Sequence, residues 1–127
     1  MRWVKMRPTS CFTAAVLIMC AIATLTPRTA WAHAVLVSAQ PGDNSTVVGP
    51  DVAVLLKYNS RIDMEHSALV LLAPGGKLEK VAIAGQPAPG LLSAKLTGLV
   101  KGAYELRWQV LATDGHVTRG KVLFQIK

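Results

Sequence analysis

An alternating run near the C-terminus constrains the fold of this chain most. Residues 104–110 alternate between apolar and polar side chains, and Val122, Phe124 and Ile126 repeat the same period further on. A period of two is typical of β-strands with one buried face. The segment Thr113-Asp114-Gly115-His116 lies between the two runs and has the composition of a tight turn. The pattern predicts a β-hairpin whose turn presents a carboxylate and an imidazole.

Short apolar runs separated by turn-forming residues occupy the rest of the chain after residue 32. We expect further strands at 34–38, 52–58, 68–72, 77–83 and 91–96, and a polar loop or bend at 59–66. The run at 52–58 is apolar at both alternating sets of positions, which favours a place near the middle of a sandwich. About seven short strands without an amphipathic helix predict an all-β, immunoglobulin-like Greek-key β-sandwich. Trp108, Leu69 and Leu71 are expected in its core.

The first 32 residues are organised differently. Three basic residues among the first seven precede an apolar run at 12–25, and Ala30-Trp31-Ala32 follows as a small-x-small cleavage site. This order is typical of a secretory signal peptide. We therefore expect residues 1–32 to be removed and residues 33–127 to form one exported domain. An uncleaved membrane anchor is the alternative, although the apolar run is short for a membrane span.

Removal of the leader changes the cysteine content and the net charge of the exported domain. Both cysteines, Cys11 and Cys20, leave with it, so the exported domain has no disulfide and no thiol ligand. Four of the 14 basic residues also leave, and the remaining 10 basic and 7 acidic residues give a net charge of +3. Without a cluster of lysine or arginine, we expect no binding of nucleic acid. Without a nucleophile motif or a glycine-rich phosphate loop, we expect no enzyme activity.

Metal-binding side chains stand at both ends of the exported domain. Cleavage after Ala32 would give His33 a free α-amine, which can chelate a metal together with its ring Nδ1. The imidazole of His116 would add a third nitrogen, and Asp114 would add an oxygen. Tetragonal coordination by nitrogen and oxygen is preferred by Cu(II), so we predict one Cu(II) per mature domain. The absence of cysteine and the single methionine, Met64, argue against a Cu(I) site.

Three stretches of the sequence resemble one known family. They read His33-Ala-Val-Leu-Val-Ser-Ala-Gln-Pro-Gly-Asp-Asn-Ser, then Val52-Ala-Val-Leu-Leu-Lys-Tyr-Asn-Ser, then Gly102-Ala-Tyr-Glu-Leu-Arg-Trp followed by Thr113-Asp-Gly-His-Val-Thr-Arg-Gly. Together they resemble the CopC-type periplasmic copper-binding proteins of bacterial copper resistance. The resemblance implies an immunoglobulin-like β-sandwich in the periplasm that binds Cu(II) through His33, Asp114 and His116. It also implies a partner, a membrane copper-transport protein of the CopD type, and we expect the chain itself to be a monomer.

The sequence departs from better-known members of that family at two places. Members with a cuprous site carry a methionine-rich segment, which is missing here. Many members also have Phe-Ser-Glu or Phe-Asn-Glu at the end of the second strand, with the glutamate near copper. This chain reads Tyr58-Asn59-Ser60 instead. Whether Ser60 or His66 replaces the glutamate is left open by the sequence.

Three functions fit the pattern to different degrees. We favour a Cu(II) carrier or buffer that serves copper resistance or copper uptake. A copper-dependent oxygenase resembling the lytic polysaccharide monooxygenases would share the N-terminal histidine brace, but this small domain has little room for an extended substrate face. In a metal-free interaction domain, His33 would be an accident of cleavage.

Overall fold

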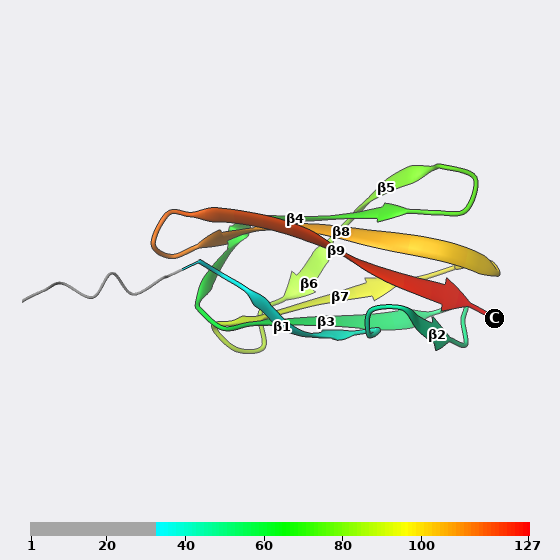
Figure 1. Ribbon diagram of the computed structural model, residues 1–127, viewed down its shortest axis with the longest axis horizontal. Helices are drawn as coiled ribbons and strands as arrows, with labels where there is room; N and C mark the ends of the chain where they lie inside the picture. The colour runs from blue at the N-terminus through cyan, green and yellow to red at the C-terminus, as the bar shows by residue number, and fades with distance from the viewer. Residues whose placement is uncertain (1–32) are drawn as a thin grey trace, which may run out of the picture. The chain divides into compact units, whose positions relative to one another are not determined.

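Two β-sheets packed face to face form the part of the chain that the computed structural model describes, residues 33–127 (Figure 1). The strands are β1 (Leu36–Gln40), β2 (Ser45–Val47), β3 (Val52–Tyr58), β4 (Ile62–Leu72), β5 (Leu78–Val81), β6 (Ile83–Gly85), β7 (Leu91–Leu96), β8 (Gly102–Ala112) and β9 (Val117–Ile126). One sheet has the order β1-β3-β7-β6 and the other has the order β2-β9-β8-β4-β5. This architecture confirms the predicted all-β sandwich of the immunoglobulin-like kind.

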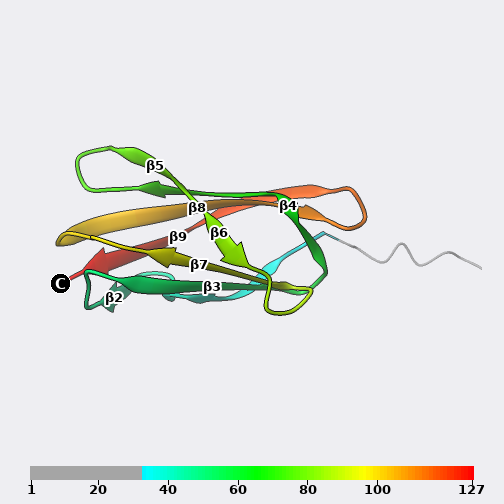
Figure 2. The same ribbon diagram turned by 180° about the vertical axis from the view of Figure 1, so that it is seen from behind.

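Nine strands are present instead of about seven. The two additional strands arise from pairing between segments that are distant in the sequence. The short strand β2 lies beside β9 in parallel, with Ser45 opposite Phe124. The strand expected at 77–83 is divided at Ala82 into β5, which pairs with β4, and β6, which pairs with β7. Figure 2 shows the chain crossing between the two sheets at this point.

The polar segment 59–66 is not a loop throughout, which corrects the sequence-based expectation. Strand β4 begins at Ile62, and its first residues pair with the end of β8 before the register shifts ahead of Ala68. Within this irregular segment, the Ser67 hydroxyl donates to the carbonyl of Asp63 at 2.6 Å and accepts the N–H of Leu111 at 3.4 Å. The Ser67 side chain thus replaces hydrogen bonds that the interrupted ladder lacks. Because the pairing is irregular here, the sequence of this segment does not alternate with a period of two. His66 consequently belongs to a strand.

The core lies between the sheets and is made of alternate residues from each strand. The most completely buried large side chains are Val54, Leu56, Leu69, Leu71, Leu92, Leu106, Val110, Val122 and Phe124. Trp108 is 8% exposed and packs edge to face against Tyr58, with ring centroids 5.3 Å apart, so its predicted core position is confirmed. Strand β3 buries only one face, because Leu55 is 37% exposed while its neighbours at 54 and 56 are buried. Within its sheet β3 lies between β1 and β7, which agrees with the predicted place near the middle of the sandwich.

Opposite Trp108 on β9 lies Gly120, and the missing side chain makes room for the indole. A Cβ atom at residue 120 would lie 2.3 Å from Trp108 Cζ2. The β8–β9 hairpin is therefore joined by close packing as well as by its ladder, and it provides a rigid support for the turn at its tip.

The predicted signal peptide, residues 1–32, lies outside the described residues. Within residues 33–127, no helix is long and apolar enough to cross a membrane.

Candidate metal centre

The start of the described chain and the turn between β8 and β9 meet at one end of the sandwich (Figure 1). There the imidazole rings of His33 and His116 lie edge to face, with centroids 4.7 Å apart and an interplanar angle of 85°. Two histidines from opposite ends of the domain sequence are thus neighbours. Both were predicted from the sequence as site residues.

The turn 113–116 holds its two functional side chains through its own hydrogen bonds. The Ala112 N–H donates to the His116 carbonyl at 2.8 Å, and the Gly115 N–H donates to the Ala112 carbonyl at 2.9 Å. Gly115 has φ of 90°, a left-handed conformation that suits glycine at this point of a hairpin. These bonds close the hairpin directly beneath Asp114 and His116.

Asp114 fixes the ring of His116. Its Oδ1 accepts the main-chain N–H of His116 at 3.0 Å, and its Oδ2 lies 3.0 Å from His116 Nδ1. An ionised carboxylate only accepts hydrogen bonds, so this contact places the proton of a neutral imidazole on Nδ1. Nε2 then carries the lone pair that a metal requires. This is the way in which carboxylates commonly orient metal-binding histidines.

Local hydrogen bonds and charges favour the ionised form of the Asp114 carboxylate. Its pKa is lowered chiefly by the main-chain N–H of His116, and further by the His116 side chain and by the charges of His116 and His33. The His116 side chain is 60% exposed, which leaves the imidazole accessible to an ion from solvent. A negative oxygen and two imidazoles facing water are chemically suited to a divalent cation.

On the other side of the site, the chain enters the sandwich immediately after His33. Ala34 is 0% exposed and belongs to the core. Val35 is held by Asn59, whose Oδ1 accepts the Val35 N–H at 2.8 Å and whose own N–H donates to the Val35 carbonyl at 3.0 Å. No role was predicted for Asn59 from the sequence, where it follows a predicted strand and is the middle residue of Tyr58-Asn59-Ser60.

The structure brings together the three predicted ligands, His33, Asp114 and His116, through the contacts given above. Within residues 33–127, no three or more side chains of histidine, cysteine, aspartate or glutamate are arranged so that they could hold a metal ion. Of the three nitrogens in the predicted site, two belong to the imidazoles of His33 and His116 and the third is the α-amine of His33. In the full-length chain that nitrogen belongs to the peptide bond with Ala32.

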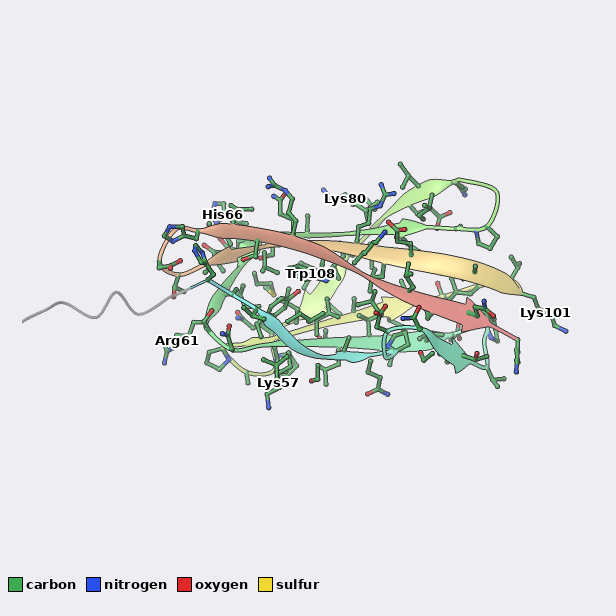
Figure 3. The ribbon with its side chains drawn as sticks, viewed as in Figure 1. Lys57, Arg61, His66, Lys80, Lys101 and Trp108 are labelled. Carbon is green, nitrogen blue, oxygen red and sulfur yellow. The ribbon has the colours of Figure 1, made fainter. Side chains whose placement is uncertain are left out.

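His66 and Ser60, the two residues considered as substitutes for a glutamate, have different surroundings. His66 lies at the same end of the sandwich (Figure 3), with its Nδ1 2.8 Å from Oδ2 of Asp63. That hydrogen bond is the main reason why the pKa of Asp63 is lowered. The Ser60 hydroxyl is buried and has no hydrogen-bond partner among the described residues. The structure therefore pairs His66 with Asp63 and gives Ser60 no partner in this region.

Proteins similar to this chain include copper resistance proteins. A family model described as the CopC domain matches residues 36–127. Copper resistance protein C from Xanthomonas campestris pv. juglandis is 29% identical over 113 residues, which cover 83% of this chain and 88% of that protein. The crystal structure of CopC from Methylosinus trichosporium OB3b is similar in fold, with a TM-score of 0.67 and 30% identity over 75% of this chain and 94% of that one. PcoC, a methionine-rich copper resistance protein from Escherichia coli, is similar in fold with a TM-score of 0.61 and 23% identity, covering 76% of this chain and 100% of that one.

Proposed function

The chain belongs to the CopC family, and we propose that it is a periplasmic Cu(II) carrier that binds one ion through a histidine brace at its mature N-terminus. Under this proposal, residues 1–32 are a signal peptide and residues 33–127 are the exported domain. The observation that carries the proposal is the 4.7 Å contact between the His33 and His116 rings. This contact supports the proposal, because the ring of His33 lies beside an imidazole that the Asp114 carboxylate orients.

The donors suit Cu(II) in number and kind. The α-amine and Nδ1 of His33 supply two nitrogens from one residue, and Nε2 of His116 supplies the third. Three nitrogen donors would suit the tetragonal coordination that Cu(II) prefers, whereas structural zinc sites favour a closed tetrahedron. Asp114 holds His116 in place and adds negative charge beside the ion. Its Oδ2 is engaged with His116 Nδ1, so we assign it an orienting role before a ligand role.

The exposure of the site supports a carrier or buffer in preference to an enzyme. His116 projects from a turn and its side chain is 60% exposed, so an ion bound there would remain within reach of a second protein. We propose a membrane copper-transport protein of the CopD type as that partner, with this chain acting as a monomer. The cellular role would be copper resistance or copper uptake.

Titration of the mature protein with Cu(II) tests the proposal. The protein should be exported and processed by the host, and mass spectrometry should establish that it begins at His33. Electron paramagnetic resonance should then show one tetragonal Cu(II) with nitrogen ligands. Trp108 is the only tryptophan after residue 32, so quenching of its fluorescence gives an independent binding curve. Absence of binding, or preference for Zn(II) in direct competition, would refute the proposed function.

A further inference from the structure

Asn59 attaches the N-terminal segment to the sandwich at the point where the regular ladder ends. Strand β1 pairs with β3 from Leu36 opposite Tyr58 onward, with an irregularity directly after Leu36. One residue before this ladder, Asn59 contacts both main-chain polar groups of Val35, accepting its N–H at 2.8 Å and donating to its carbonyl at 3.0 Å. The side-chain oxygen and the main-chain N–H of Asn59 together thus extend the pairing to Val35.

We propose that Asn59 is a positioning residue for the copper site. By fixing Val35, it sets where the α-amine and imidazole of His33 lie relative to His116. The inference rests on the proposed function, because it concerns the same copper site. It assigns the two halves of that site separate supports, with Asp114 holding His116 and Asn59 holding the segment that carries His33.

Packing alone holds this segment only weakly. Ala34 is buried, but its side chain is a single methyl group, and the burial of one such group contributes little. The Val35 side chain is 55% exposed, so its packing contributes less than that of a buried valine. The hydrogen bonds of Val35 therefore contribute more to holding this segment in place than they would in the middle of a sheet. Of the two bonds to Asn59, only the one to Oδ1 depends on the identity of the side chain.

The main chain that carries Asn59 is itself held firmly. The Tyr58 N–H donates to the Gly90 carbonyl at 2.8 Å. The approach of Gly90 is so close that an added Cβ would lie 2.9 Å from the Tyr58 carbonyl oxygen and 3.1 Å from that of Ser60. Asn59 is thus presented from a platform with little freedom, as a positioning residue requires.

The test compares two substitutions of Asn59 in mature protein that begins at His33. Asn59→Leu removes the acceptor while keeping the same number and branching of heavy side-chain atoms, and Asn59→Asp retains an acceptor oxygen. We expect Asn59→Leu to weaken Cu(II) binding roughly three- to tenfold, the equivalent of one net hydrogen bond, and Asn59→Asp to bind at least as tightly as the parent. The matched control is Gln109→Leu, which removes the 2.7 Å bond from Arg119 on the other sheet and should leave copper binding unchanged.

Repeating the Asn59 substitution in a His116→Ala protein distinguishes a positioning role of Asn59 from a general effect on stability. In His116→Ala protein, the remaining nitrogen donors all belong to residue 33, so their position relative to the rest of the sandwich no longer matters. Asn59→Leu should then have no effect on the residual copper affinity. The same three- to tenfold loss in this background would overturn the proposal, as would equal affinity of Asn59→Leu and the parent. A parent protein that binds no copper would instead refute the proposed function itself, so the two failures are distinguishable.

Discussion

Gly120→Ala should destabilise the sandwich while leaving the copper site intact. A Cβ at this position would lie 2.3 Å from Cζ2 of Trp108, 2.7 Å from Cε2 and 3.0 Å from Cη2. These atoms belong to a rigid indole that packs edge to face against Tyr58 at 5.3 Å, so the ring cannot turn aside without disturbing the opposite sheet. Gly120 is not among the glycines with positive φ, so alanine fits the main-chain conformation and the steric conflict is isolated.

The expected magnitude follows from two opposing effects. Forcing a methyl group into a packed core costs about 1–3 kcal/mol. Replacing glycine at a compatible conformation recovers about 0.4–1 kcal/mol through the unfolded state. The free energy of unfolding should therefore fall by about 1–2 kcal/mol. For a domain of this size each kcal/mol lowers the Tm by about 4–8 °C, which predicts a decrease of about 4–16 °C.

Thermal unfolding followed by circular dichroism measures this change, and a Cu(II) titration below the transition measures the site. Gly42→Ala is the matched control, because its added Cβ would find no atom closer than 4.0 Å and its φ is not positive. Its Tm should stay close to that of the parent. Combining Gly120→Ala with Trp108→Leu should cost less than the two single changes added together, because a smaller side chain relieves the conflict. A parental Tm for Gly120→Ala would refute the packing of the indole over residue 120.

Three further predictions concern the copper site. His116→Ala should weaken Cu(II) binding more than Asp114→Ala, because the first removes a ligand and the second an orienting group; calorimetry on both variants tests the order, and undiminished affinity in His116→Ala would exclude that residue. One additional residue ahead of His33 converts the α-amine into an amide, so it should weaken copper binding severely while the circular dichroism and Tm of the metal-free protein stay unchanged; full affinity in the extended protein would exclude the amine. Lowering the pH from 8 to 6 should weaken binding, because an α-amine has an ordinary pKa of about 7.7–8.0 and protons compete with the metal for its nitrogen. The hydrogen bond from the His116 main chain holds the pKa of Asp114 below its usual value, so that carboxylate stays ionised throughout and does not cause the change; a pH-independent affinity would contradict the three-nitrogen site.

The sequence by itself determined the strands whose burial follows a regular pattern of apolar residues along the chain. Strands β3 and β7 begin and end where their apolar runs do, and Trp108 lies in the core as the alternation around it predicts. The turn at 113–116 was likewise readable, because glycine and aspartate have their own conformational preferences. The candidate ligands also came from the sequence, since an N-terminal histidine after cleavage and an Asp-x-His turn are chemical features of the chain itself.

Only the tertiary structure decided what depends on partners distant in the sequence. Strand β2 exists because β9 offers it an edge, and the polar start of β4 is a strand because the end of β8 lies beside it. The same holds for the contact between the His33 and His116 rings and for the attachment of Val35 by Asn59. An asparagine after a strand carries no periodic signal, and its partner Val35 becomes known only when β1 pairs with β3. The physical reason is that side-chain burial repeats along a strand, whereas a hydrogen bond between distant segments leaves no periodic trace in either of them.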